Sequence, residues 1–301
     1  MATGTRQVLL SSAKIVGILA LLYLAVLSVR QGLADSIAED ALTALTFWAK
    51  DPADLTLLQS AYQDMVRADQ LDGGHPTYLH RLGRISHLFM ALELSQRDSW
   101  AALAKDYYRA SLAVRPAWPL TWANLALVKA DLLEFDAEMD QALINASTLG
   151  PWEPGVQVMM TEIAMRGGQF MRPDVRAEVY TNISRGLVSP VKGTGRDVYQ
   201  AMAGHSVEPQ LAALLEDLLV ADDWSRNTDV VVQVAIDHLA LWQPATLPVI
   251  RGKIVAKLEE KPQRVRFLNS AVALAEVCPY LPRKRKFINQ CKRLWMLIDM
   301  I

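Results

Sequence analysis

The chain has 301 residues, of which 51% are hydrophobic, and its formal net charge at pH 7 is -1. A chain of this size can bury one large core or two smaller ones. The near-zero charge gives no overall reason to expect nucleic acid or an acidic polymer as a ligand, and we expect no nucleic-acid binding. Runs rich in Ala, Leu, Glu, Gln and Arg prevail over alternating β-branched runs, which predicts an all-α fold.

The N-terminal region carries an apolar segment long enough to span a bilayer. Residues 15–29 contain no charge, and residues 8–29 contain only Lys14. About 20 helical residues cross the hydrocarbon core, and a lysine near one end can reach the headgroups. We therefore predict a transmembrane anchor within residues 1–34 that contacts the lipid bilayer through residues 8–29.

The charges that flank this segment predict its orientation. Arg6 and Lys14 lie on the N-terminal side, whereas Asp35, Glu39 and Asp40 follow the apolar run. Because an excess of basic residues marks the cytoplasmic flank, we expect a cytoplasmic N-terminus and an exported body.

A cleaved signal peptide is the alternative to an uncleaved anchor. The small residues Gly32 and Ala34 form a candidate cleavage site. However, Arg30 lies between the apolar run and that site, and the run is long for a signal sequence. We therefore favour the uncleaved anchor.

Proline and glycine residues divide the body into a series of short helices. Up to residue 190 we predict helices over residues 35–50, 54–68, 78–94, 99–114, 120–132, 136–148, 156–165 and 173–187. After a linker at 191–195, we predict helices over residues 209–221, 229–242, 245–258, 263–276 and 287–300. The expected organisation is a cytoplasmic N-terminus and anchor (1–34), helical repeats (35–190) and a helical C-terminal region (191–301).

Part of the body matches the pattern of a tetratricopeptide (TPR) repeat. Trp122 and Ala126 occupy the large and small positions of a first helix, Ala142 and Ala146 the small positions of a second, and Pro151 closes the unit. A less regular copy precedes it, carried by Leu82, Gly83, Tyr108, Leu112 and Pro116. Small residues let paired helices approach each other, so we predict a TPR-like helical-repeat domain, an α-solenoid.

The same stretch resembles a bacterial protein family. The sequences RPAWPLTWANLALVK at 115–129 and GPWEPGV at 150–156, with the late segment 278–283, are similar to the VpsP-type exopolysaccharide-biosynthesis proteins. The resemblance covers residues 8–190 and this late segment, whereas residues 191–263 depart from the family pattern. It implies an inner-membrane anchor, a periplasmic TPR-like body, and polysaccharide biosynthesis or export proteins, or the glycan itself, as partners. It brings no catalytic residues.

Three tryptophans gather around proline-rich turns: Trp118, Trp122 and Trp152. The simpler interpretation places them in the core between repeats. The functional interpretation is a surface on which a sugar or a peptide stacks, because exposed aromatic side chains mark recognition surfaces.

The C-terminal region adds a basic segment and two cysteines. Arg283, Lys284, Arg285 and Lys286 form either a solvated helix face or a surface for anionic headgroups or an acidic polysaccharide. Export to an oxidising compartment would allow a disulfide between Cys278 and Cys291, and the alternative is two reduced, buried thiols.

No pattern of catalytic or metal-binding residues stands out. His80 and His87 lie two helical turns apart without a third ligand, so we interpret them as ordinary surface or groove residues. No G-x-S-x-G, H-E-x-x-H or paired C-x-x-C motif is present. The predicted function is a non-catalytic scaffold without a cofactor. The alternatives are a scaffold of another envelope machine, such as pilus or cytochrome assembly, or a glycan-acting enzyme with its site in the C-terminal half.

Overall fold

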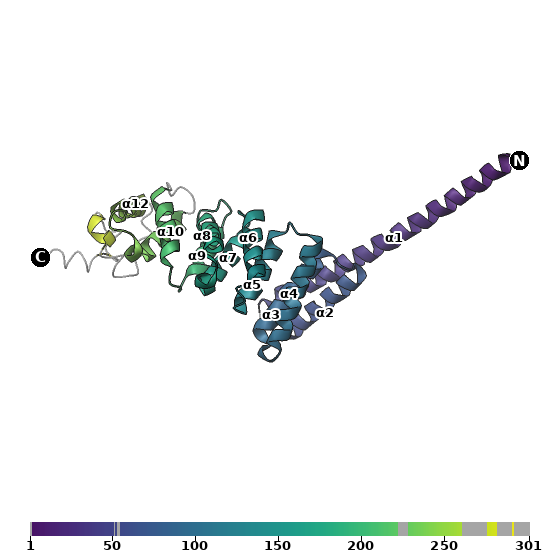
Figure 1. The fold of residues 1–301 in the computed structure, drawn as a ribbon, viewed down its shortest axis with the longest axis horizontal. Coiled ribbons are helices and arrows are strands. Elements are labelled where there is room, and N and C mark those ends of the chain that lie inside the picture. The colour runs from purple at the N-terminus through teal and green to yellow at the C-terminus, as the bar shows by residue number, and fades with distance from the viewer. Residues whose placement is uncertain are drawn as a thin grey trace. The chain divides into compact units, whose positions relative to one another are not determined.

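The computed structural model describes residues 2–50, 52, 55–221, 228–260, 276–281 and 291 (Figure 1). Over these ranges the chain is all-helical and contains no strand, which confirms the predicted all-α class, while the TPR-like solenoid arrangement stays a prediction. The α-helices are α1 (Ala2–Trp48), α2 (Leu55–Leu71), α3 (Pro76–Leu92), α4 (Arg97–Val114), α5 (Pro119–Asp131), α6 (Ala137–Leu149), α7 (Pro154–Gly167), α8 (Pro173–Leu187), α9 (Thr194–Met202), α10 (Pro209–Ala221), α11 (Thr228–Asp237) and α12 (Leu247–Glu260). Short 3-10 turns are η1 (Leu94–Gln96), η2 (Gly168–Phe170), η3 (Leu239–Leu241) and η5 (Cys278–Tyr280).

The N-terminal helix α1 has an exposed part and a packed part. Every side chain from residue 14 to residue 33 is exposed, and Figure 1 shows this part extending beyond the helices that α1 packs against. The helix is long and apolar enough to cross a membrane. Ala34, Ala38 and Ala41 are buried, because these small residues lie on one face and let α2 approach. The helix therefore continues through the predicted boundary at residue 34 without a break.

The chain divides into two compact units, residues 1–128 and 129–301, called unit 1 and unit 2 below. Within unit 1, consecutive helices pack on each other, α1 on α2, α2 on α3, and α3 on α4. Arg30 donates a hydrogen bond from Nη2 to the carbonyl of Leu71, 2.8 Å away, which ties α1 to the end of α2. The core of this unit is built from Leu58, Met65, Leu82 and Phe89 together with the alanines of α1.

Helices α3 and α4 approach each other closely at Gly83. Gly83 of α3 faces the ring of Tyr108, which is fully buried. A Cβ atom at position 83 would lie 2.6 Å from Cε1 of Tyr108. Ser111 of α4 donates a hydrogen bond of 2.8 Å to the carbonyl of Pro76, at the first turn of α3. The absence of a side chain at Gly83 is thus what lets the tyrosine ring fill the space between the two helices.

Unit 2 continues as a series of packed helices. Helix α7 packs on α8 and α9, and α8 also packs on α6, α9 and α10. Farther along, α11 packs on α9 and α12. Each of these helices therefore contacts neighbours that are one or two positions away along the chain.

The predicted linker at 191–195 is partly wrong. The turn ends at Gly193, which has a φ of 95°, and α9 begins at Thr194. Thr194 and Gly195 are buried because α9 packs on α7 and α8. The two glycines look like a flexible segment in the sequence, but tertiary packing orders the second of them inside a helix. The helical body thus runs on across the predicted boundary at 190.

A disulfide joins Cys278 of η5 to Cys291, 13 positions later. The side chain of Arg251 links η5 to α12, since its guanidinium lies 4.4 Å from the ring centroid of Tyr280 and donates to the Tyr280 hydroxyl over 2.6 Å. Of the two last predicted helices, residues 263–275 and, apart from Cys291, residues 287–300 lie outside the described residues.

Candidate functional site

Trp118 lies half-buried at the turn between α4 and α5. Its ring packs against the imidazole of His80, with ring centroids 4.4 Å apart and planes inclined by 30°. The guanidinium of Arg115 lies 4.5 Å from the centroid of the Trp118 indole, as a cation–π contact. These contacts occupy much of the Trp118 ring within unit 1.

His80 is buried, which corrects the expectation of an ordinary surface or groove residue. Its side chain is 6% exposed, and Nδ1 lies 2.9 Å from Oγ1 of Thr121. Burial, followed by repulsion from Arg84, Arg81 and Arg115, lowers the pKa of His80 to about 3. The imidazole is therefore neutral at physiological pH, and its role is to pack α3 against Trp118 and α5.

We expect unit 1 to lose stability on acidification through His80. The pKa is about 3 in the folded chain and about 6.5 in an unfolded one, so the unfolded state binds more protons between these values. The stability that the neutral ring supports is fully present above pH 6.5, and roughly 3 kcal/mol of it is lost by pH 4. Urea unfolding, followed through hydrogen exchange of unit 1 peptides at pH 7 and at pH 4, measures this loss.

The variant His80→Gln is the control for this effect. Its amide can keep the hydrogen bond to Thr121 and does not titrate, so unit 1 of this variant should depend less on pH. Carboxyl titrations common to both proteins cancel in the comparison. Equal losses in the two proteins between pH 7 and pH 4 would contradict the assignment to His80.

The other two predicted tryptophans differ in exposure. Trp122 is half-buried in unit 1 and donates a hydrogen bond of 2.7 Å from Nε1 to the carbonyl of Pro116. Trp152 lies in unit 2, in the turn between α6 and α7, and exposes 52% of its surface. Trp118 and Trp122 are therefore engaged in contacts of unit 1, while Trp152 presents a large open face.

The predicted basic segment, Arg283 to Lys286, lies outside the described residues, and its role as an anionic surface stays a prediction. Across the described ranges, no three side chains of His, Cys, Asp or Glu gather as a metal site. The buried carboxylate among the described residues of the C-terminal half is Glu216. It accepts hydrogen bonds from the backbone N–H of Gln243 and the hydroxyl of Thr246, so it orders the turn that leads into α12.

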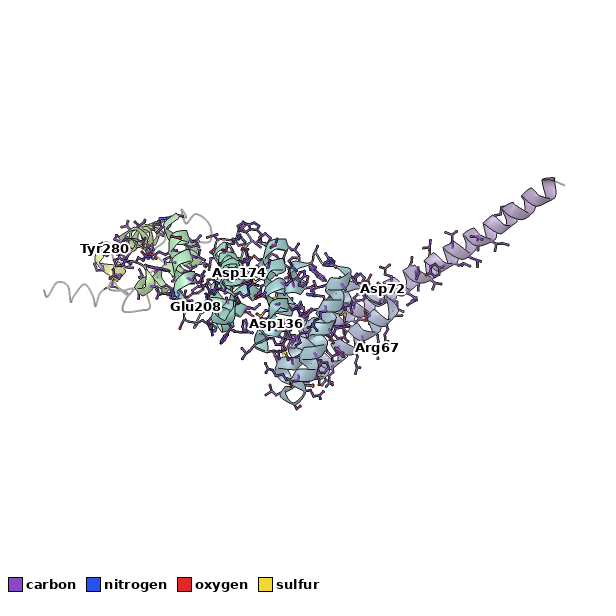
Figure 2. The ribbon with its side chains drawn as sticks, viewed as in Figure 1. Arg67, Asp72, Asp136, Asp174, Glu208 and Tyr280 are labelled. Atoms are coloured by element: carbon purple, nitrogen blue, oxygen red, sulfur yellow. A yellow bond between two sulfur atoms is a disulfide. The ribbon has the colours of Figure 1, made fainter. Side chains whose placement is uncertain are left out.

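A buried lysine organises the turn between α5 and α6. The ammonium of Lys129, whose side chain is 2% exposed, lies 2.8 Å from Asp136 and 2.9 Å from Glu138. Glu134 is the third carboxylate of this network, at 3.3 Å. Asp136, labelled in Figure 2, also accepts a hydrogen bond of 3.0 Å from the backbone N–H of Met139, as the N-cap of α6. The network thus fixes where α6 begins.

The charges of this network shift the pKa values of its members. Burial by itself would lower the pKa of Lys129, but hydrogen bonds to Asp136 and Glu138 outweigh burial and raise it. Burial would likewise raise the pKa of Asp136, but the bonds from Lys129 and Met139 outweigh it and lower that pKa. Lys129 and Asp136 therefore both carry their charges at neutral pH, as a structural ion pair requires.

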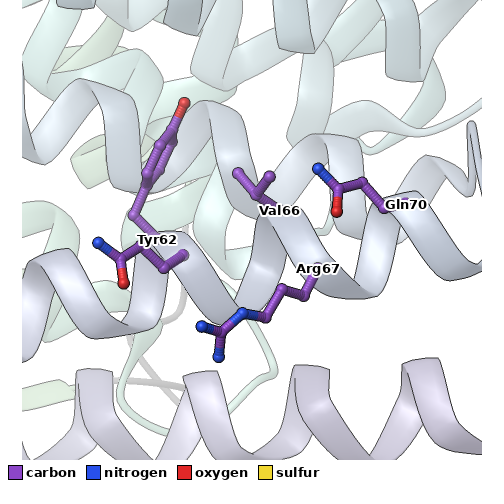
Figure 3. Close-up of a pocket in the computed structure, with 5 residues that line it drawn as sticks. Tyr62, Val66, Arg67 and Gln70 are labelled. Atoms are coloured by element: carbon purple, nitrogen blue, oxygen red, sulfur yellow. The ribbon is translucent and has the colours of Figure 1, made fainter.

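A groove on unit 1 was missed by the sequence analysis. It consists of two adjoining hollows of about 300 and 280 Å³, which share Tyr62 and Gln63 of α2 as lining residues. One hollow follows α2 as far as Gln70, and Figure 3 shows Tyr62, Val66, Arg67 and Gln70 in succession along that helix. The other is also lined by Phe89 of α3, by Glu93 directly after that helix, by Gln96 of η1 and by Trp100 of α4.

Aromatic rings form the wall where the three helices meet. The rings of Phe89 and Trp100 stack with centroids 4.4 Å apart, and Tyr62 meets Trp100 edge-on at 5.5 Å. The indole N–H of Trp100 donates a hydrogen bond of 2.9 Å to Glu93. The hydroxyls of Tyr62 and Tyr107 lie 3.2 Å apart. Each ring is held by a neighbour, so the wall is formed before any ligand arrives.

The sequence indicates only the α2 side of this groove. Gln59, Gln63, Val66 and Gln70 recur at spacings of three and four, which places them on one side of a helix. A polar helix face of this kind predicts only solvent-exposed surface. Phe89 and Trp100 belong to other helices, and only the packing of α2 on α3 and of α3 on α4 brings them beside these residues.

Comparison with known proteins assigns the chain to no family. No protein-family model matches it, and a search of curated proteins finds no match. The resemblance to VpsP-type proteins therefore stays a prediction. Function has to be inferred from the apolar helix, the helical body and the groove.

Proposed function

We propose that this chain is a non-catalytic, membrane-anchored scaffold of bacterial exopolysaccharide biosynthesis or export. In this proposal the N-terminus lies in the cytoplasm, residues 8–29 cross the inner membrane, and a TPR-like body in the periplasm binds assembly proteins or the glycan. The proposal joins the resemblance of residues 115–129 and 150–156 to one structural observation. That observation is the unbroken run of α1 from the exposed apolar part into the core of unit 1.

The continuity of α1 supports a role close to the bilayer. From Val29, the last residue of the apolar run, to Ala34, the next buried residue after it, the helix advances five residues, or about 8 Å at 1.5 Å per residue. Since the described chain has no flexible linker between them, unit 1 would be held against the membrane surface. This geometry would place the body next to membrane-bound partners.

Packing in the body supports the TPR-like part of the proposal. Gly83 and Tyr108, which belong to the less regular copy, form the close contact between α3 and α4. Ala126 in α5, and Ala142 and Ala146 in α6, are each buried, as expected for the small positions of a TPR copy. In unit 2, helices contact both their first and second neighbours along the chain, which is the pattern that stacked helix pairs produce.

Affinity co-purification of the full-length chain from membranes tests the proposal. We expect glycosyltransferases, a polymerase or a polysaccharide export protein to be recovered, and not to be recovered with an unrelated single-span protein that carries the same tag. Recovery of pilus or cytochrome assembly components instead would overturn the polysaccharide assignment. Hydrolysis or transfer of glycan by the purified chain would overturn the non-catalytic part.

The orientation needs a separate test. Alkaline phosphatase, which is active only after export, should be active when fused after residue 260 and inactive when fused to a version that lacks residues 1–29. A fusion to full-length chain that stays inactive would reverse the proposed topology.

A further inference from the structure

The groove on unit 1 has the chemical composition of a binding site for an uncharged ligand. Its lining combines the half-buried aromatic rings of Tyr62 and Trp100, backed by the buried ring of Phe89, with the side-chain amides of Gln59, Gln63, Gln70 and Gln96. The four glutamines are exposed, so their amides face the solvent that a ligand would replace. An amide offers two donors and an acceptor, whereas an aromatic ring offers an apolar face. A ligand that matches both must carry hydroxyl groups around an apolar ring.

The charged side chains in the groove lining already have partners and do not offer an opposite charge to a charged ligand. Glu93 already accepts the hydrogen bond from the Trp100 indole. Arg67 is paired with Asp64 at 3.0 Å. One cation and one anion, each with its own partner, leave the lining close to neutral. An acidic or a basic chain would lose hydration without gaining an opposite charge in return.

Peptide recognition fits the groove less well. Addition of a strand needs an exposed sheet edge, and the groove is formed by helices whose backbone groups are bonded within them. An amphipathic helix needs a row of aliphatic contacts, and Val66 is the aliphatic side chain of this lining. A proline-rich segment, which binds between aromatic rings, is the peptide that remains as a competitor.

The shape of the groove suits a linear chain. The lining residues of α2 run from Gln59 to Gln70, 11 positions or about 16 Å along the helix axis. The two hollows share Tyr62 and Gln63 and are open to the solvent, so a chain can lie along them without being enclosed.

We propose that this groove binds an uncharged segment of a glycan chain, with sugar rings against Tyr62 and Trp100 and hydroxyls on the amides of Gln59 and Gln63. The choice of a glycan over other polyhydroxylated ligands rests on the proposed scaffold function. The location of the site and its preference for an uncharged ligand rest on the lining alone. The scaffold would then hold the polymer on the unit that continues directly from the anchor.

The test uses the full-length chain, purified from membranes in detergent micelles, on an array of uncharged and acidic oligosaccharides and a proline-rich peptide. We expect binding to at least one uncharged oligosaccharide, and its affinity should fall at least tenfold in Gln59→Ala/Gln63→Ala. Alanine is a good residue at exposed helix positions, so this variant should remain folded. The matched control is Gln31→Ala/Gln200→Ala, two exposed glutamines outside the groove, whose affinity should stay within twofold.

Several results would overturn the inference. These are binding of acidic oligosaccharides only, the absence of any binding to uncharged ones, an unchanged affinity in Gln59→Ala/Gln63→Ala, and binding of the proline-rich peptide in the groove instead. The outcome is separable from that of the proposed function. Recovery of polysaccharide assembly proteins without glycan binding would leave the scaffold and remove the groove ligand. Glycan binding together with recovery of another envelope machine would keep the groove ligand and overturn the polysaccharide scaffold.

Discussion

Gly83→Ala should destabilise unit 1 by about 2 kcal/mol, although alanine is a better helix former than glycine. The gain in helix propensity is about 1 kcal/mol. Against it, the new Cβ would lie 2.6, 2.7 and 2.9 Å from three ring atoms of Tyr108, and this ring is fully buried. Overpacking of a core costs about 1–3 kcal/mol, and three such short contacts place this site at the upper end of that range. Displacement of the ring would also weaken its 3.4 Å hydrogen bond to Asn124.

Hydrogen exchange of α3 and α4 peptides measures this loss in the full-length chain. The matched control is Gly252→Ala in α12, where nothing lies within 4 Å of a new Cβ. This control should stabilise its own helix by up to about 1 kcal/mol. The double variant Gly83→Ala/Tyr108→Leu should recover part of the loss, because the smaller side chain frees the space. If Gly83→Ala increases protection as Gly252→Ala does, the close contact between α3 and α4 is wrong.

Lys129→Met should cost unit 2 about 2 kcal/mol. Removal of one partner from a fully buried ion pair costs about 3–5 kcal/mol, because the remaining charge is left without compensation. Here three carboxylates would remain close together, but Glu134 and Glu138 are 35% exposed and Asp136 is 55% exposed, so water screens part of the cost. The first turn of α6 should show the loss most clearly, because Asp136 is its N-cap.

The pH dependence distinguishes this ion network from simple packing. The lowered pKa of Asp136 means that its contribution to stability is present above the ordinary pKa of about 4 and is lost as the pH falls further. In Lys129→Met, by contrast, protonation of the carboxylates relieves their repulsion. The difference between the two proteins, measured by hydrogen exchange of α5–α6 peptides, should therefore shrink from pH 7 to pH 4.

Two further variants complete the comparison. Glu138→Gln should restore part of the stability of Lys129→Met, since it removes one of the repelling charges. Lys192→Met changes an exposed lysine of the same unit and should stay within about 0.5 kcal/mol of the parent chain. A loss in Lys129→Met that is the same at both pH values would assign Lys129 to packing alone.

Local sequence signals placed most of the helices. The predicted ranges 173–187 and 209–221 coincide with α8 and α10, and both helices begin at a proline. Proline has a fixed φ and lacks an N–H, so it suits the first helical turn and marks that position in any context. The length and composition of the apolar run likewise needed no tertiary information.

Some sequence patterns have a structural meaning that depends on tertiary packing, and the predictions made from these patterns were wrong. Gly193 and Gly195 together predict a flexible linker, yet only the first adopts a positive φ, and the second is buried in α9. The anchor and the first body helix form one helix, because no proline lies between Val29 and Trp48 and a single glycine, Gly32, is tolerated inside a long helix. Their division at residue 34 reflected a change from apolar to charged residues, which alters what surrounds a helix without ending it.

The sequence by itself determined the helical class, the membrane-length apolar segment, most helix positions and the cysteine pair as disulfide candidates, because these depend on composition, periodicity and local backbone preference. Tertiary structure alone decided that His80 is buried and neutral, that Lys129 meets three carboxylates, and that Trp100 and Phe89 lie beside the glutamines of α2. These contacts join residues from different helices or across turns. Their pKa values and their exposure follow from the packing of those elements, which no single segment encodes.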